Sequence, residues 1–323
     1  MINDMWYIVL DSKEVKENKP LRVKRFNKEL IFWRNTKKEI VCFDNLCVHG
    51  NIALSLKKTK DNCTYCSFNG FEFNEKNECI FIPVNGKDFS VSNKYKTKFY
   101  KVTELNGFIC FWFGEERISY PKITFFDSID ESFSHGKTYK ETFNTHFTRC
   151  IENHLNVAHL PFINEITLKK EKNSIINDIL VEFENNSLYV WIDNKKVSKH
   201  KIKNKDLNHL KNNDPDVEFI FPNILILRIS RLFYGFIIFA QEEDEKTVLY
   251  VRFHQKIISV KLLKAFFKVI DDFFSIKKIR TDKVIVESHF PKNSLLDTDE
   301  KLTDSELAII SFRNIIRNSL LVK

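Results

Sequence analysis

Five of the seven cysteines of this 323-residue chain fall within the stretch 42–79, and a histidine lies among them. They are Cys42, Cys47, Cys63, Cys66 and Cys79, and the histidine is His49. Thiolates and imidazoles are ligands that iron and zinc take in proteins. Clustered cysteines beside a histidine therefore indicate a metal site before they indicate a disulfide framework.

The most specific spacing in this stretch is Cys47-Val48-His49, followed after sixteen residues by Cys66-Ser67-Phe68-Asn69-Gly70-Phe71-Glu72-Phe73. It resembles the Rieske [2Fe–2S] motif, in which two β loops each supply one cysteine and one histidine. Two thiolates hold one iron of that cluster and two imidazoles hold the other. The resemblance implies that Cys47, His49 and Cys66 are cluster ligands, with Asn69 in the place of the second histidine. A neutral amide is a weak donor to iron, so we expect an impaired cluster.

Cys63 leaves a second interpretation open, because it precedes Cys66 by three residues. Cys47, His49, Cys63 and Cys66 together offer three cysteines and one histidine, a set that suits zinc or an altered cluster. The chain would then be a zinc-stapled binding domain, or Cys63 would replace the ligand missing at Asn69. The plainer alternative is that Cys63 is a half-buried strand residue upstream of the ligand loop.

A second motif runs from Glu152 to Asn164 and reads ENHLNVAHLPFIN. It resembles the E-N-x-x-D-x-A-H-x-P-F-x-H segment of the α subunits of Rieske-type non-haem iron aromatic-ring-hydroxylating oxygenases. In that family two histidines and a distant aspartate bind one Fe(II) and leave positions open for oxygen and substrate. The resemblance makes His159 an iron ligand, with Asn164 in the place of the second histidine. Asn156 stands where an aspartate bridges this iron to the cluster of a neighbouring subunit.

The late segment TDKVIVES resembles the part of the family that supplies the third iron ligand, which makes Asp282 the candidate. His154 lies five residues before His159, so a site displaced to His154 is an alternative. The plainer interpretation is that His154, like His146 and His289, is an ordinary hydrogen-bonded or surface histidine.

The resemblance implies an oxidoreductase that hydroxylates or demethylates a small organic substrate with O₂. It also implies a [2Fe–2S] cluster, a mononuclear Fe(II), a reductase or ferredoxin as electron donor, and a ring-like homotrimer. Because three ligand or bridging positions hold asparagine, we expect one or both metal centres to be impaired, altered or absent. The alternative is a catalytically inactive member of the family that acts as a ligand-binding or partner subunit.

The patterning of the chain predicts an α+β protein with two parts that could position these residues. Short, turn-bounded β segments fill residues 1–115 and predict an antiparallel β domain of Rieske type. Residues 116–138 are expected to form a linker. The segment 139–323 is expected to form a helix-grip-like catalytic domain, with helices laid on an antiparallel sheet. Its helices are predicted at 139–162, 260–274 and 302–320, and strand-like runs lie between the first two.

Bulk properties exclude several other classes. The net charge is +8, but the lysines are scattered and we see no basic stripe interleaved with stacking aromatics, so no nucleic-acid partner is expected. No apolar run approaches the roughly 18 residues that a membrane span needs. The N-terminal segment lacks the pattern of a secretory signal, which predicts a cytoplasmic protein.

Overall fold

The computed structural model describes residues 1–17, 19–57, 59–129, 132–157, 174–196, 207–256, 276–296 and 298–321. The chain forms two compact units, which are described separately. The first unit comprises Met1, Asn3–Ile123 and Ala240–Glu243. The second comprises Ile2, Thr124–Phe239 and Asp244–Lys323. The domain borders predicted at residues 115 and 139 stay a prediction.

The first unit contains three small antiparallel sheets, each of three strands. The first sheet has the order β1 (Met5–Asp11), β9 (Phe108–Phe113), β8 (Val102–Leu105). The second has the order β2 (Leu21–Arg25), β3 (Lys28–Arg34), β4 (Ile40–Asp44). The third has the order β5 (Thr64–Tyr65), β6 (Glu72–Phe73), β7 (Cys79–Phe81). Short 3₁₀ turns lie at Ser12–Glu14, Leu54–Leu56 and Pro83–Asn85.

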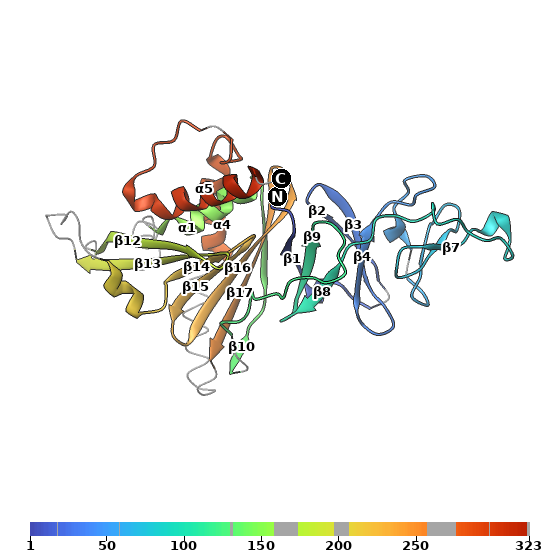
Figure 1. Cartoon of the computed structure of the whole chain (residues 1–323), viewed down its shortest axis with the longest axis horizontal. Helices are drawn as coiled ribbons and strands as arrows, with labels where there is room; N and C mark the ends of the chain where they lie inside the picture. The colour runs from blue at the N-terminus through green and yellow to red at the C-terminus, as the bar shows by residue number, and fades with distance from the viewer. Residues whose placement is uncertain are drawn as a thin grey trace. The chain divides into compact units, whose positions relative to one another are not determined.

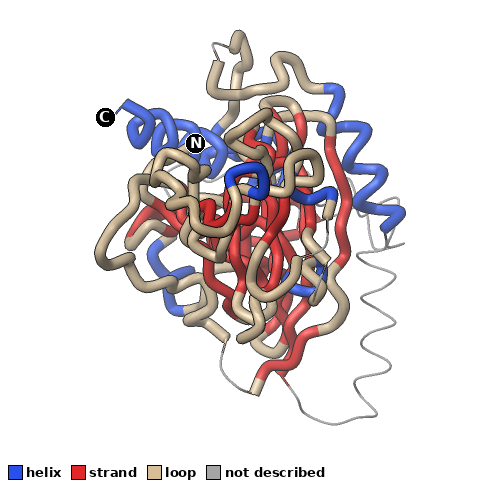
Figure 2. The backbone as a smooth tube through the Cα atoms, turned by 90° about the vertical axis from the view of Figure 1, so that its right-hand side faces the viewer, coloured by secondary structure: helices blue, strands red, loops and turns tan. Residues whose placement is uncertain are grey.

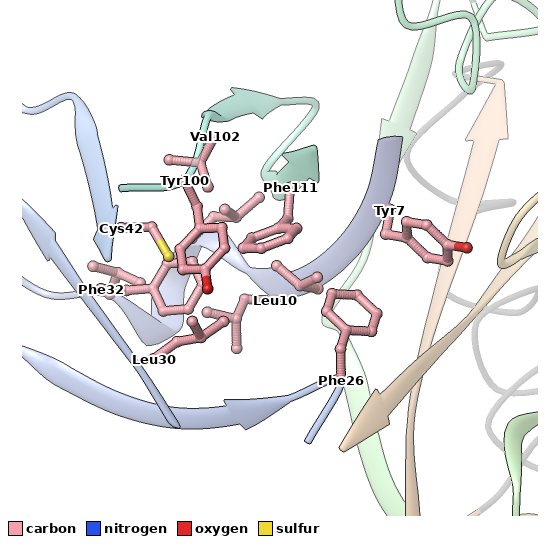
Figure 3. Packing of buried hydrophobic residues seen from close by; sticks show 12 residues of the cluster. Tyr7, Leu10, Phe26, Leu30, Phe32, Cys42, Tyr100, Val102 and Phe111 are labelled. Carbon is pink, nitrogen blue, oxygen red and sulfur yellow. The ribbon is translucent and has the colours of Figure 1, made fainter. Parts of the chain in front are cut away.

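Strand β3 separates two apolar clusters of this unit. Successive side chains of a strand point to opposite faces of its sheet, so alternate residues of β3 enter different clusters. Leu30 and Phe32 enter the cluster shared with β1 and β9 (Figure 3). Ile31 and Trp33 enter the second cluster. That second cluster also contains Cys47, Cys66, Phe71 and Phe73, so the motif cysteines are anchored in a packed interior.

The second unit is built on one eight-stranded antiparallel sheet, with helices on one face (Figure 1). The strand order is β10 (Phe133–His135), β17 (Lys246–Lys256), β16 (Phe233–Glu243), β15 (Ile224–Ser230), β14 (Val217–Ile220), β13 (Ser187–Lys196), β12 (Ser174–Glu184); β11 (Tyr139–Phe143) also pairs with β17. The helices are α1 (Phe147–Leu155), α4 (Ile276–Ser288) and α5 (Leu307–Leu321), with 3₁₀ turns at Asn208–Asn212 and Asp304–Glu306. Strands predominate in the described chain (Figure 2), and the predicted α+β class is confirmed.

The prediction of one helix over residues 139–162 was wrong at its start. Residues 139–143 form β11, which pairs with β17 from Tyr139↔Val251 to Phe143↔Thr247. Helix α1 begins only after His146, whose ring nitrogen Nδ1 accepts the Thr148 backbone N–H and caps the helix. The predicted helix at 302–320 is present from Leu307 onward, and the one at 260–274 lies outside the described residues.

Buried His254 on β17 gives this unit a testable pH dependence. His254 is 3% exposed, and its ring lies 4.7 Å from that of Phe236. Burial lowers the pKa of His254 to about 3, and the nearby Arg252 and His135 act in the same direction. Because this folded-state pKa lies below the ordinary 6.5, the unfolded chain binds more protons between the two values. The stability is therefore full above pH 6.5 and is lost as the pH falls toward 3.

We expect the free energy of unfolding to fall by about 2 kcal/mol between pH 7 and pH 5 through His254 alone. Denaturant titrations at the two pH values measure the change. The variant His254→Gln, which cannot titrate there, is expected to lose correspondingly less over the same interval. An equal loss in both proteins would show that His254 is not the responsible group.

Candidate functional site

The two motif loops of the first unit close with the same backbone hydrogen bonds. In the first loop the Cys47 N–H donates to the Ile52 carbonyl over 2.9 Å, and Asn51 N–H donates to the Cys47 carbonyl over 2.8 Å. In the second loop the Cys66 N–H donates to the Phe71 carbonyl over 2.8 Å, and Gly70 N–H donates to the Cys66 carbonyl over 3.0 Å. Each loop therefore folds back on its own cysteine at the same two positions.

The residue four places after each cysteine adopts a left-handed backbone conformation. It is Asn51 in the first loop, with φ of 53°, and Gly70 in the second, with φ of 71°. Asparagine tolerates this region better than most residues, and glycine adopts it freely. A Cβ added to Gly70 would also meet the Pro83 ring at 3.0 Å, so the second loop requires glycine there.

The closed loops place the thiols of Cys47 and Cys66 side by side in the interior. Both residues are buried, at 0% and 1% exposure, and both belong to the same packed cluster. Burial raises the pKa of the Cys47 thiol to about 11; the His49 and Gly50 backbone N–H groups oppose the rise, and the Cys66 thiol adds to it. Two adjacent buried thiols, one of which accepts backbone N–H groups, are suited to bind an iron as thiolates.

The nitrogen-bearing positions of the two loops are exposed, in contrast to the thiols. His49 and Asn69 are both exposed residues. The His49 ring lies over Phe71, with 5.0 Å between the ring centroids and 34° between their planes. The two loops thus bury the sulfur donors and expose the imidazole of His49. The amide of Asn69 stands at the fourth position and is also exposed.

Cys63 occupies a different place from the thiol pair. It lies at the base of a two-residue turn, where Lys60 and Cys63 exchange backbone hydrogen bonds of 3.0 Å and 2.8 Å. Burial raises the pKa of the Cys63 thiol, and the carboxylates of Glu72, Asp61 and Glu75 raise it further. In the part of the chain that the structure describes, no group of three or more His, Cys, Asp or Glu side chains is arranged to hold a single metal ion. The zinc interpretation that uses Cys63 finds no support in this geometry.

We expect Cys63→Ala to leave unchanged the visible absorption of protein reconstituted with iron and sulfide, because its thiol is not paired with Cys47 or Cys66. Cys66→Ala is expected to abolish most of that absorption, since it removes one of two sulfur donors. Spectra recorded under argon at equal protein concentration compare the two variants. Loss of colour in Cys63→Ala alone would restore the interpretation in which Cys63 replaces a ligand.

The second motif begins in helix α1, whose end is occupied by Asn156. Its backbone N–H donates to the Glu152 carbonyl over 2.8 Å and closes the helix. The Asn156 side-chain oxygen Oδ1 is shielded from solvent and has no hydrogen-bond partner among the described residues. An unsatisfied buried carbonyl oxygen is costly, so this position is suited to a ligand or polar group not among those residues.

The remaining residues of the proposed iron site are only partly described. Asp282 lies in α4, is half-buried, and its Oδ1 is shielded from solvent. His159 and Asn164 lie outside the described residues, so their proximity to Asp282 stays a prediction.

The histidines for which the sequence offered a plain structural interpretation are all hydrogen-bonded. The His154 Nδ1 lies 2.7 Å from the Cys150 carbonyl, which can only accept, so Nδ1 carries the proton. The His154 ring also packs against Phe239 of β16, with centroids 5.3 Å apart. His146 and His289 bond to Thr148 and to the Val286 carbonyl. The alternative in which the iron site is displaced to His154 is not supported, because no metal-binding group among the described residues includes this histidine.

Sequence reasoning missed a buried ion network that holds α1 in place. Glu152 accepts from Arg313 of α5 through both carboxylate oxygens, over 2.7 Å and 2.9 Å. Arg149 reaches Glu152 over 3.2 Å and Glu300 over 2.8 Å, and Arg313 reaches Glu300 over 2.6 Å. Arg313 and Glu300 lie more than a hundred residues from Glu152 and Arg149 in sequence, so spacing gave no indication of the contacts between the two pairs. Motif residue Glu152 thus has a structural role.

Comparison with known proteins identifies the domain that carries the first of these sites. Residues 5–101 match the family description "Rieske [2Fe-2S] domain". The iron-sulfur subunit of the toluene-4-sulfonate monooxygenase system of Comamonas testosteroni is 22% identical over 185 residues, 55% of this chain and 51% of that protein. Aminopyrrolnitrin oxygenase of Pseudomonas fluorescens is 24% identical over 179 residues, 54% of this chain and 49% of that protein. The chain thus spans about half the length of these curated relatives.

Solved structures extend the likeness to nearly the whole chain. The NdmA protein of Pseudomonas putida CBB5 has a TM-score of 0.74 at 19% identity, covering 97% of this chain and 89% of that one. The reduced complex between oxygenase and ferredoxin in carbazole 1,9a-dioxygenase has a TM-score of 0.76 at 15% identity, covering 97% and 88%.

Residues 5–101 therefore carry a Rieske domain, and the chain has the fold of these solved proteins. The resemblance stated from the motifs is confirmed. None of the helices in the described ranges has the length and apolar character that a bilayer crossing requires.

Proposed function

We propose that the chain is an oxygenase-type oxidoreductase subunit that hydroxylates or demethylates a small organic molecule with O₂, and that its metal centres are altered. The observation that carries the proposal is the adjacent pair of buried thiols, Cys47 and Cys66, in two loops that close alike. Both motif cysteines are thereby presented together inside a Rieske domain.

The residues present fit one half of a [2Fe–2S] cluster and only part of the other. Cys47 and Cys66 would hold the inner iron, and His49 would supply one nitrogen to the outer iron. Asn69 offers a neutral amide in the fourth position, which is a weaker donor than imidazole. When bound, such a cluster supplies one-electron transfer. The chain's own contribution is to bury the sulfurs, expose the imidazole and order both loops.

The mononuclear iron centre is proposed from the motif at residues 152–164 and from its two described residues, Asn156 and Asp282. His159 and Asp282 would hold one Fe(II), and Asn164 stands in the place of the third ligand. Asn156 cannot carry the negative charge of the aspartate that the family uses to connect the centres. Electron delivery between the centres is therefore expected to be slow even where both hold metal.

A catalytically inactive partner subunit is the second candidate, and the three asparagines at positions 69, 156 and 164 favour it. Such a subunit would retain the fold, bind a ligand in the former substrate site or assemble with an intact relative.

We propose a homotrimer for either function, and light scattering at micromolar concentration tests it. All seven cysteines are free, which supports a reducing compartment such as the cytoplasm.

The deciding experiment is the metal content and visible spectrum of protein purified without oxygen from iron-supplemented cells. On the enzyme proposal, the protein holds some iron and consumes O₂ slowly when a reductase and a ferredoxin supply electrons. Colourless, iron-free protein that still forms trimers would favour the partner function. A full complement of both metals with rapid turnover would contradict the altered centres.

A further inference from the structure

The first unit contains a hollow of about 620 Å³ that no residue of either cysteine loop lines. Its walls come from the hairpin between β6 and β7, from the segment that leads into β8, and from the end of β9 with the residues that follow it. A volume of a few hundred cubic ångströms is the size of pocket that small molecules occupy. The hollow is therefore large enough for a ligand and separate from both metal motifs.

The wall that follows β9 is held in place by two tryptophans. Trp112 Nε1 donates to the Glu115 carbonyl and Trp6 Nε1 donates to the Pro121 carbonyl, each over 2.9 Å. The Tyr120 ring, which lines the hollow, packs on both indoles, with centroids 5.3 Å from Trp112 and 5.7 Å from Trp6. This wall is ordered without a ligand, so binding there requires little ordering of the backbone.

Four exposed lysines line the hollow, namely Lys76, Lys96, Lys98 and Lys101. Lys98 Nζ lies 5.6 Å from the centre of the Tyr100 ring, and Lys101 Nζ lies 5.9 Å from that of Tyr120. An aromatic ring attracts an ammonium group through its quadrupole and leaves the positive charge unneutralised. Neither ammonium group forms an ion pair in the part of the chain that the structure describes. Both are thus positioned by rings and available to an anion.

The acidic residues of the lining limit how much negative charge a ligand can carry. Glu78, Glu115 and Glu116 also line the hollow, so four lysines against three glutamates leave a single net positive charge. Charge complementarity favours a ligand of opposite and equal charge, and like charges disfavour the alternatives. A monoanion such as a carboxylate therefore suits the hollow better than a dianion such as a phosphate ester.

The hollow also offers aromatic surface to a ligand. Of the four aromatic residues in its lining, Tyr100 and Trp112 are buried, Tyr120 is half-buried and Phe99 is 41% exposed. Aromatic rings pack favourably on one another beyond the gain from burying their area. The accessible rings of Phe99 and Tyr120 therefore favour a ligand with a flat, unsaturated part.

We propose that this hollow is a binding site for a small aromatic carboxylate. The carboxylate accepts hydrogen bonds from the ammonium groups of Lys98 and Lys101, and the ring of the ligand lies against Phe99 and Tyr120. Binding is non-covalent, so no bond forms or breaks. The site uses no residue of either metal motif, so the inference goes beyond the proposed oxygenase function and does not depend on it.

The test uses the full chain and cinnamate as the probe, with the dissociation constant measured by titration calorimetry at low salt. The hollow variant carries Lys98→Gln and Lys101→Gln. The matched control carries Lys16→Gln and Lys37→Gln, which remove two exposed lysines of the same unit that do not line the hollow. We expect the hollow variant to bind cinnamate at least about tenfold more weakly, because two hydrogen bonds to a charged group are lost. The control should bind like the unmodified chain.

Two further probes test the chemical class of the ligand. Cinnamamide has nearly the shape of cinnamate without its charge, and phenyl phosphate is a dianion at mildly alkaline pH. Both are expected to bind the unmodified chain more weakly than cinnamate does. Phe99→Ser, which removes the exposed ring, should also weaken the binding of cinnamate. Equal affinity for cinnamamide and cinnamate, or tighter binding of phenyl phosphate, would contradict a site for a carboxylate.

The outcome for the hollow and the outcome for the metal centres are independent, because the titration requires neither metal nor turnover. Equal dissociation constants in the hollow variant and the control would show that cinnamate binds elsewhere on the chain and would overturn the site. The absence of any binding to the unmodified chain at millimolar cinnamate would overturn it as well. Lys98→Arg with Lys101→Arg, which keeps both positive charges, should retain most of the affinity.

Discussion

The variant Asn69→His is expected to bind iron and sulfide at least about tenfold more tightly than the unmodified chain and to show the visible bands of a Rieske centre. Changes in groups that only orient ligands already alter metal affinity by about 10–100-fold, so adding a nitrogen donor should do no less. The loop that carries residue 69 is closed by backbone bonds and by Gly70, so the substitution requires no new backbone conformation. Iron and sulfide analysis after anaerobic reconstitution measures the gain.

Asn69→Gln is the matched control, since it keeps a neutral amide at the same exposed position. Adding Asn156→Asp and Asn164→His to Asn69→His should raise iron uptake further, because both changes supply donors to the second centre. About three iron atoms in the unmodified chain, two from a cluster and one mononuclear, would refute the expectation at once.

Removing Arg313 is expected to cost about 3–5 kcal/mol of unfolding free energy. Glu152 is buried and takes both of its bidentate hydrogen bonds from this guanidinium. The pKa of Arg313 is raised by those contacts with Glu152, despite the opposing effect of burial. In Arg313→Met, two carboxylates share only Arg149, so one buried charge loses its partner. Denaturant unfolding at neutral pH measures the loss.

Two variants make this prediction specific. Arg317→Met removes an exposed arginine from the same helix and should change the stability little. The double variant Glu152→Gln with Arg313→Met leaves Arg149 paired with Glu300 and should recover part of the loss. If Arg313→Met and Arg317→Met unfold at the same denaturant concentration, the network does not hold α1 to α5.

Sequence reasoning succeeded where the determinant is local. The resemblance of Cys47, His49 and Cys66 to the Rieske motif predicted two loops that each carry a cysteine, and short alternating apolar runs predicted the antiparallel sheets. It failed at residues 139–143, which the predicted helix over 139–162 includes, because pairing with β17 decides the conformation there. It also could not identify Arg313 as a partner of Glu152, since that contact depends on tertiary packing.

Cys63 shows a limit of arguments from spacing, because a spacing that suits a metal pair is occupied by a turn that holds this thiol among carboxylates.

The two motif loops close with matching backbone hydrogen bonds, and this decides what the substitution of a ligand residue in either loop would measure. Each loop reaches its closed form through amide–carbonyl bonds and one left-handed residue, without using a ligand side chain. Binding a metal there would order little additional chain, so the entropy of arranging the loops is already spent in folding. A series of substitutions at position 69 would then rank donor atoms by their intrinsic affinity for iron. In this respect the domain is a preorganised receptor in which the donor at position 69 can be changed while the scaffold stays intact.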